Sequence, residues 1–355
     1  MAYNRKQRLN DNIKAIETAF ILDREQRTPT ARERLLLERY CGFGGLKCIL
    51  NPARELADAV HWAKSDLELF APTVELHRLI RENSKNESEY KQLMDSLKQS
   101  VLTAFYTPSA VTEALTDVLK EHQIIPEKVL EPSAGIGAFV DSVLDNNPKA
   151  DIMAFEKDLL TGKILRHLYP EQKVRIEGFE KIEKPFNDYF DLAISNIPFG
   201  DVAVFDPSYT AMKGMRALVT RRIHNYFFVK ALDTVRDGGL VAFITSQGVL
   251  NAKNNSAARF MMLYHADLVS AIRLPNNLFT ENANTEVGSD LIILQKNSQK
   301  ESLRGDDNLL DTVYNDENRI PTNNYFLEHP ERIIHTTAKL DTDPFGKPAM
   351  IYTHE

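Results

Sequence analysis

The pattern of apolar and polar positions divides the chain into three stretches. Residues 1–100 carry apolar side chains at helical spacing, as in NIKAIETAFIL, ARERLLLERY and YKQLMDSLKQSVL. Residues 101–297 change to short apolar runs that are bounded by turn residues. Residues 298–355 show few sustained patterns. We therefore expect a helical N-terminal region, a central catalytic domain and an irregular C-terminal tail.

The central stretch has the texture of an α/β domain. Its short runs, rich in β-branched and aromatic residues, are KVLEPSA, DIMAFE, KVRIEG, FDLAISN, GLVAFITS, LVSAIRLP and DLIILQK. Most neighbouring runs leave room for a helix between them, which is typical of a mostly parallel sheet covered by helices. We predict a Rossmann-like sheet of about seven strands whose ligands bind at the carboxyl ends of the strands.

Composition and charge exclude several classes of protein. No run approaches the roughly 18 apolar residues that a membrane span needs, and the first residues lack the apolar core of a signal peptide. A cytoplasmic protein is expected. The two cysteines, Cys41 and Cys48, are too few for a disulfide framework or a cysteine-rich zinc site, so we expect no metal. The tail 298–355 is acidic, with six basic and eleven acidic residues.

A glycine loop follows the first run of the central domain. In VLEPSAGIGAF, Gly135 and Gly137 allow the backbone to approach a ligand, and the next helix offers free N–H groups. Glu156 ends the second run, where a carboxylate can accept both ribose hydroxyls. This predicts a nucleoside-containing cofactor. A nicotinamide cofactor would also suit such a loop, although Val140 breaks the G-x-G-x-x-G pattern.

Two flanking features favour a cationic cofactor with a carboxylate. Glu131, at the end of the first run, can face the sulfonium and ammonium of S-adenosylmethionine. Thr107 and Pro108 open a helix whose N–H groups can bind a carboxylate. The alternative interpretations are that Glu131 is a surface or helix-capping carboxylate and that Thr107 and Pro108 begin an ordinary capped helix.

The fourth run breaks abruptly in the sequence DLAISNIPFGD, residues 191–201. A buried strand can end in many ways, but an amide, a proline and an aromatic ring in this order can also grip a planar group that bears an amino group. The motif therefore indicates a substrate site at the end of this strand.

The ordered set of motifs resembles a known family. FYTP, LEPSAGIGAF, the FE pair at 155–156, NIPFG, GGLVAFITSQGVL, IRLPNNLF and SDLIILQK follow the order of the γ-type amino-methyltransferases. Residues 103–297 resemble an adenine-N6 DNA methylase, similar to the modification subunits of type I restriction systems. With YCGFGGLKCILNP and YFLEHPERII, the chain most resembles the methylase part of methylase-helicase proteins of bacterial conjugative elements.

The resemblance implies roles for individual residues. The Asn196 side chain and the Ile197 carbonyl would accept the amino hydrogens of adenine, Phe199 would stack on the base, and Pro198 would shape the turn. The implied S-adenosylmethionine site comprises Tyr106, Thr107, Pro108, Glu131, Pro132, Ser133, Gly135, Gly137, Phe155 and Glu156. Two departures stand out: Ile197 replaces the usual first proline, and Phe179 stands where an acid often holds the cofactor adenine, with Glu180 next. Both Phe179 and Glu180 are candidates for that contact.

The segment after the motif indicates a DNA partner. Residues 207–232 hold five basic residues and no acid, and they include the candidate phosphate contacts Lys213, Arg216, Arg221 and Arg222. A solvated helix face would explain the same run. An enzyme that acts on a base inside a duplex must flip that base out. Phe279, in IRLPNNLF, is a second candidate for stacking on the flipped base.

Other functions remain open at this stage. Cytosine-C5 methylation is excluded because neither cysteine follows a proline or lies in the central domain, and cytosine-N4 enzymes tend to have serine in place of Asn196. The alternatives are a protein-glutamine N5 methyltransferase and a degenerate methylase that binds cofactor or DNA without catalysis. Sequence recognition would come from residues 1–100, from a separate subunit, or from a longer protein that also carries a helicase, unless the sequence specificity is low.

Overall fold

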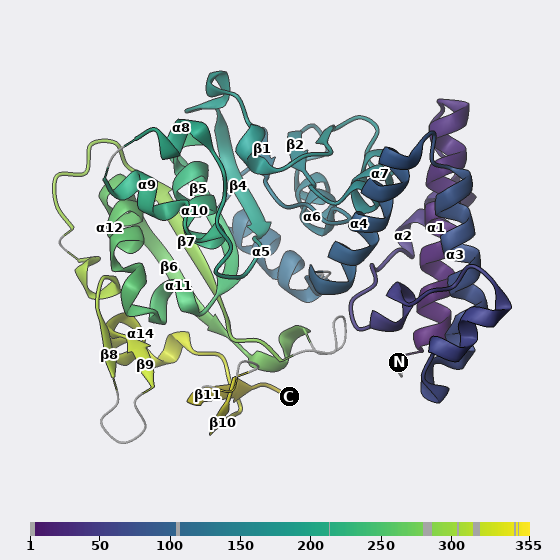
Figure 1. The fold of residues 1–355 in the computed structure, drawn as a ribbon. Helices are drawn as coiled ribbons and strands as arrows, with labels where there is room; N and C mark the ends of the chain where they lie inside the picture. Colours follow the sequence, from purple (N-terminus) through teal and green to yellow (C-terminus); the bar gives the residue numbers. More distant parts are fainter. Residues whose placement is uncertain are drawn as a thin grey trace.

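The computed structural model describes residues 4–103, 107–212, 214–279, 286–303, 305–314, 320–343, 346 and 348–355. Its centre is a seven-stranded sheet in the order β3-β2-β1-β4-β5-β7-β6 (Figure 1). The strands are β1 Lys128–Glu131, β2 Asp151–Phe155, β3 Lys173–Arg175, β4 Phe190–Asn196, β5 Val235–Ser246, β6 Ala266–Leu274 and β7 Ser289–Lys296. Each overlaps one of the seven predicted runs, and β5, β6 and β7 begin before theirs. The predicted α/β architecture is therefore confirmed.

Strand direction locates the place where ligands bind. The pairs β1–β2, β2–β3, β1–β4 and β4–β5 are parallel, and β7 runs antiparallel to both β5 and β6. From β1 the chain builds outward through β2 to β3, and from β4 it builds in the other direction. The sheet thus changes winding between β1 and β4. A crevice at the carboxyl ends of such a pair is the usual ligand site of a doubly wound sheet.

Helices cover both faces of the sheet, which explains why its strands are apolar on both sides. Along β4, Leu192 and Ile194 belong to one core cluster and Ala193 belongs to the other, as the two-residue period of a strand requires. The first face is covered by α5 Ser109–Glu121, α6 Ala138–Asn146 and α7 Leu159–Leu168. The second is covered by α10 Ile223–Thr234 and α12 Ser256–His265, with the short helices α8 Pro207–Thr210, α9 Met215–Val219 and α11 Gly248–Asn251 nearby.

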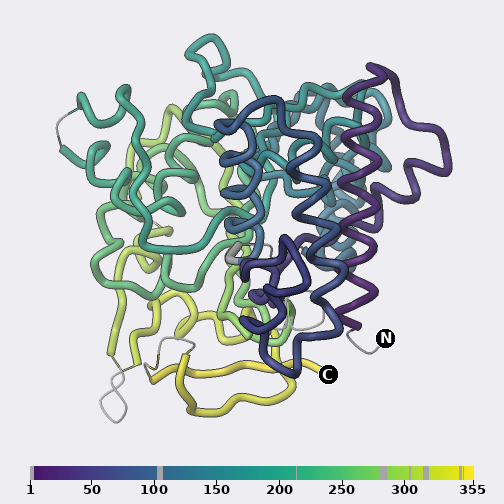
Figure 2. The backbone as a smooth tube through the Cα atoms, turned by 45° about the vertical axis from the view of Figure 1, so that its right-hand side comes forward, coloured from purple at the N-terminus to yellow at the C-terminus, as the bar shows by residue number. Residues whose placement is uncertain are grey.

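The N-terminal region is helical, as predicted, and packs beside the sheet domain. It contains α1 Arg5–Glu25, α2 Ala31–Glu38, α3 Phe70–Glu82 and α4 Glu87–Thr103, joined partly by short 3-10 turns. Helices α1, α2 and α4 all contact α7, and Figure 2 shows them stacked along one side of the molecule. Asp23 of α1 fixes this contact, because it binds Lys163 at 2.5 Å, Arg166 at 2.9 Å and His167 at 2.8 Å.

The C-terminal tail differs from the irregular segment that we predicted. It forms a hairpin of β8 Thr312–Tyr314 and β9 Pro321–Asn323, the helix α14 Asn324–Glu328, and a hairpin of β10 Thr337–Thr342 and β11 Pro348–Thr353. The buried Asn323 anchors it, because its Nδ2 donates to the carbonyls of Leu250 at 2.9 Å and Leu309 at 2.8 Å. Three-residue strands are too short to produce a periodic pattern, and asparagines that serve as anchors resemble loop residues in a sequence.

In the described part of the chain, no helix is both long enough and apolar enough to cross a membrane.

Candidate active site

The loops that follow β1 and β4 meet at the carboxyl edge of the sheet. β1 and β4 are direct neighbours, with Val129 opposite Leu192 and Leu130 opposite Ala193. The buried Ser195 donates its hydroxyl hydrogen to the Ser133 carbonyl at 3.1 Å, which ties the end of β4 to the glycine loop. The predicted cofactor loop and the predicted substrate motif therefore lie side by side.

The glycine loop adopts a backbone that other residues would strain. Gly135 has φ 56° and Gly137 has φ 91°, both in the left-handed region. A Cβ atom on Gly137 would come within 2.3 Å of the Tyr169 ring. The Tyr169 hydroxyl donates to the Gly137 carbonyl at 3.1 Å, so the ring holds the loop at the start of α6. The geometry thus requires glycine at position 137 and favours it at position 135.

Glu156 is bound to the glycine loop through its carboxylate. The Gly135 N–H donates to Oε2 at 2.8 Å, and the Asp158 N–H donates to Oε1 at 2.7 Å. Burial, reinforced by the nearby charge of Asp158, raises the pKa of Glu156 to about 8. The side chain is still partly exposed. It can therefore reach a ligand, and hydroxyl donors from that ligand would stabilise its ionised form.

Glu131 presents a buried oxygen without a partner. The side chain is 2% exposed, and its Oε2 has no hydrogen-bond partner among the described residues. Burial raises the pKa of Glu131 well above its usual value, and the carboxylate of Glu156 adds to the shift. A buried acid of this kind is costly unless something compensates its polar atom. The ammonium and sulfonium of S-adenosylmethionine fit this site, because their positive charge would stabilise the carboxylate.

The other predicted cofactor residues differ in their exposure. Thr107 and Pro108 precede α5, and Pro108 takes the N-cap position of that helix. Pro132 is buried, Ser133 is partly exposed, and Phe155 is fully buried at the end of β2. Tyr106 lies outside the described residues.

Phe179 and Glu180 take different positions after β3. Phe179 is 1% exposed and contacts the rings of Phe155, Tyr226 and Phe227, with centroids 5.3 to 6.4 Å away. Glu180 folds back over Gly178, where a Cβ atom would come within 2.1 Å of Oε2. Of these two candidates, Glu180 has the more accessible side chain.

The NIPFG motif follows directly from β4. Asn196 pairs with Ile244 in the sheet, and its partly exposed side chain makes no hydrogen bond to any described residue. Pro198 and Phe199 are also partly exposed, and Phe199 packs against the core cluster that includes Phe279. An unused amide thus lies at the centre of the edge where the cofactor loop and the motif meet.

Ile197 has a structural reason to replace the family proline. Its side chain is 1% exposed in the second core cluster, and its N–H donates to the Ile244 carbonyl at 3.0 Å. Proline has no N–H to make this bond. The isoleucine therefore extends the pairing of β4 with β5 by one residue, while its own carbonyl is retained.

The basic segment 207–232 is divided between the two ends of α10. Arg216 forms two bonds with Asp233, at 2.7 and 2.9 Å, near the C-terminal end of that helix. Arg222, at the opposite end, binds Asp201 at 2.8 Å and so holds the loop that follows NIPFG. Arg221 is exposed and its side chain has no partner among the described residues. Lys213 lies outside the described residues.

Two further findings could not be read from the sequence. Phe279 is completely buried, so its ring is not available to stack on a base in this conformation. Asn255 is 1% exposed and accepts hydrogen bonds from Arg222 at 2.5 Å and Asn225 at 2.9 Å. Its Nδ2 donates to the Gly248 carbonyl at 2.8 Å, so it links the loops after β4 and β5. No local pattern marks such a residue.

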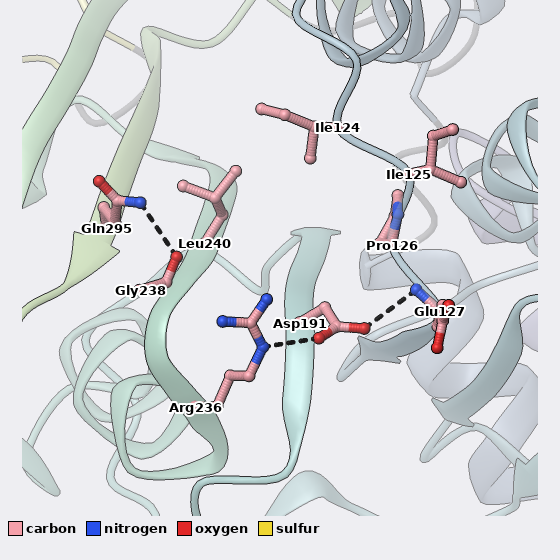
Figure 3. A pocket seen from close by; sticks show the side chains of 9 residues that line it. All are labelled: Ile124, Ile125, Pro126, Glu127, Asp191, Arg236, Gly238, Leu240 and Gln295. Carbon is pink, nitrogen blue, oxygen red and sulfur yellow. Dashed lines mark hydrogen bonds and ion pairs between the residues drawn. The ribbon is translucent and has the colours of Figure 1, made fainter.

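A separate hollow of about 510 Å³ lies at the opposite, amino edge of the sheet. Figure 3 shows that residues before β1 and at the starts of β4 and β5 line it. Arg236 binds Asp191 there at 2.7 Å, and the Glu127 N–H donates to the same carboxylate at 3.0 Å. None of the predicted site residues lies in it, so it is distinct from the candidate active site.

The chain is similar to several known proteins. Defense against restriction protein B of Escherichia phage P1 is 28% identical over 201 residues, which are 55% of this chain and 8% of that protein. Type II methyltransferase M.XamI of Xanthomonas campestris pv. amaranthicola is 25% identical over 173 residues, 45% of this chain and 33% of that protein. The chain thus matches a third or less of the length of either relative.

One solved structure and one family model were also found to match this chain. The type IIG restriction endonuclease BpuSI superposes with a TM-score of 0.45 at 17% identity, covering 84% of this chain and 38% of that one. The N-6 DNA methylase family model matches residues 88–350, from α4 to β11, and so reaches beyond the predicted catalytic domain 101–297 at both ends. Because this match covers most of its length, the chain belongs to the N-6 DNA methylase family.

Proposed function

We propose that this protein transfers a methyl group to the N6 amino group of adenine in DNA. Its family uses S-adenosylmethionine as the methyl donor. The observation that carries the proposal is the free Asn196 amide at the end of β4, beside a glycine loop, the buried Glu131 and the partly exposed Glu156, which suit a cationic nucleoside cofactor.

The adenine amino group is a weak nucleophile because its lone pair is delocalised into the ring. The Asn196 side-chain oxygen and the Ile197 carbonyl would accept its two hydrogens and draw them out of the ring plane. Phe199 would contact the face of the base, and the strand pairing of Ile197 would keep the carbonyl in place. S-adenosylmethionine, when bound, supplies a methyl group on a sulfonium, which suits direct in-line displacement. The residues of this chain thus contribute positioning and electrostatics more than a strong base.

The proposed DNA contact rests on Arg221. Its exposed guanidinium next to the catalytic edge is available to a phosphate, whereas Arg216 and Arg222 already hold carboxylates. We assign sequence recognition to the N-terminal helical region or to a partner subunit, because the acidic tail 298–355 suits DNA poorly. A DNA substrate also implies a cytoplasmic location.

The experiment is a competition for labelled methyl groups. The full chain is incubated with labelled S-adenosylmethionine, unmodified genomic DNA and a protein extract that lacks methyltransferase activity, and both fractions are counted. We expect the label in DNA, as N6-methyladenine after digestion to nucleosides. Label in N4-methylcytosine or in protein glutamine would contradict the proposal, and cofactor binding without transfer to either fraction would favour a binding module.

A further inference from the structure

Helix α4 of the N-terminal region contacts the turn that follows β2. Ser96 on this helix is 6% exposed, and its hydroxyl donates to Asp158 Oδ2 at 2.6 Å. The same hydroxyl oxygen accepts the Leu160 N–H at 3.0 Å. One serine, 62 residues away in the sequence, therefore makes two hydrogen bonds to this turn.

The contact continues from Asp158 to the cofactor site. The Asp158 N–H donates to Glu156 Oε1 at 2.7 Å, and the Gly135 N–H donates to Glu156 Oε2 at 2.8 Å. Asp158 also caps α7, because its Oδ1 accepts the Thr161 N–H at 2.7 Å. A continuous chain of hydrogen bonds thus runs from α4 through Asp158 and Glu156 to the glycine loop.

The two carboxylates of this turn oppose each other's ionisation, so the contribution of Ser96 to Glu156 is geometric. Burial raises the pKa of both Glu156 and Asp158, and the charge of Asp158 adds to the shift of Glu156. The hydrogen bond from Ser96 acts in the opposite direction and favours the ionised form of Asp158. Ser96 donates to Asp158 Oδ2 at 2.6 Å while the Thr161 N–H donates to Oδ1 at 2.7 Å, so without Ser96 this partly buried carboxylate would lose its bond to α4.

We propose that Ser96 is a positioning residue of the cofactor site: it holds Asp158, and through Asp158 the carboxylate of Glu156, in place for the ribose hydroxyls of the cofactor. The N-terminal helical region is then part of the cofactor-binding unit and not a separate module. This inference rests on the proposed role of Glu156 in binding the ribose.

The test compares two buried serines in the full chain. Ser96→Ala removes the contact to Asp158, whereas Ser142→Ala removes a similar pair of bonds, to the Thr112 carbonyl at 2.8 Å and Thr116 Oγ1 at 2.6 Å, away from Glu156. Calorimetry with S-adenosylhomocysteine gives the affinity, and thermal melting gives the stability. We expect Ser96→Ala to bind about tenfold more weakly than wild type, whereas Ser142→Ala keeps the wild-type affinity.

Two further readouts separate positioning from general stability. Ser96→Thr keeps the hydroxyl and should restore most of the affinity. At pH 7, wild type should release a proton on binding as Glu156 ionises, and Ser96→Ala should release less, because its Glu156 is held less well in place for the ribose hydroxyls. Calorimetry in buffers of different ionisation enthalpy measures this release.

The inference would be overturned if Ser96→Ala bound S-adenosylhomocysteine as tightly as wild type. It would also be overturned if Ser96→Ala and Ser142→Ala lost the same amount of affinity. If Ser96→Ala does not fold, Asp158→Asn tests the same contact from the other side, because it keeps the volume and an oxygen to cap α7 but loses the charged acceptor for Ser96, and wild-type affinity in that variant would also overturn it. The binding assay contains no DNA. A wild type that binds S-adenosylhomocysteine but does not methylate DNA would therefore contradict the proposed function alone, and one that fails to bind would contradict both.

Discussion

The two halves of the candidate active site differ in how completely their polar groups are paired. On the cofactor side, both oxygens of Glu156 accept backbone N–H groups, and Ser96 fixes the adjacent Asp158. On the substrate side, Asn196 and Arg221 make no side-chain hydrogen bond to any described residue. Apart from the unpaired Oε2 of Glu131, the cofactor half is thus organised before binding, whereas Asn196 and Arg221 in the substrate half stay free for a partner.

The largest expected effect follows from removing the free amide. Asn196→Ala should lower the rate of methyl transfer by about a hundred- to a thousandfold, because one acceptor of the developing charge is lost. Affinity for S-adenosylhomocysteine should stay unchanged, since Asn196 lies on the substrate side. A variant that lost both properties together would show that the two halves are not independent.

A change at Glu156 should instead lower the affinity for the cofactor product, which Asn196→Ala leaves unchanged. Glu156→Gln should weaken S-adenosylhomocysteine binding by about ten- to a hundredfold, because an ionised acceptor is replaced by a neutral one.

The pKa of Glu156 is raised to about 8 in the free protein, and we expect the ionised form to bind. Wild-type affinity should therefore rise with pH up to about 8 and level off above it, by about tenfold per pH unit at most. Affinity for S-adenosylhomocysteine measured from about pH 6 to 9 checks this. If the affinity of Glu156→Gln rose equally steeply with pH, the proton released on binding would come from another group.

The isoleucine of the motif can be tested by restoring the family residue. Ile197→Pro removes a buried side chain and the hydrogen bond to Ile244, so the free energy of unfolding should fall by about 2 to 4 kcal/mol. Denaturant unfolding measures this loss. Unchanged stability would mean that Ile197 is a neutral replacement and that its buried position contributes little.

The smallest effect is expected on the DNA surface. Arg221→Glu should weaken DNA binding several-fold and reduce the slope of log affinity against log salt by about one. Lys149→Glu, an exposed charge change between α6 and β2 at the amino edge, is the matched control. Equal slopes for Arg221→Glu and Lys149→Glu would assign Arg221 to an ordinary solvated face. Arg222 is unsuitable for this test, because its loss would also release Asp201.

Local patterns in the sequence were sufficient to predict the sheet. Every strand except the three-residue β3 buries residues on both faces and so appears as a short apolar run, and the glycine loop and Glu156 lie at fixed positions after their strands. The hydrogen bond between Gly135 and Glu156 joins two residues that the sequence had already assigned to one site.

Contacts between distant segments could not be predicted in this way. The bond from Ser96 to Asp158 joins α4 to the turn after β2, and the pair of Arg216 with Asp233 joins α9 to α10. The position of Phe279 in the core depends on the same long-range packing. A charge or a ring beside a motif therefore has an ambiguous role until its partners in the fold are known.

The most direct test of the account measures two quantities on the same preparations of wild type and Asn196→Ala. One is the amount of N6-methyladenine formed in unmodified DNA, and the other is the affinity for S-adenosylhomocysteine. The account predicts that wild type forms N6-methyladenine, and that Asn196→Ala binds S-adenosylhomocysteine equally well but forms little product. Equal product from both proteins would contradict the assigned grip on the amino group, and no product from a wild type that binds S-adenosylhomocysteine would contradict adenine in DNA as the substrate.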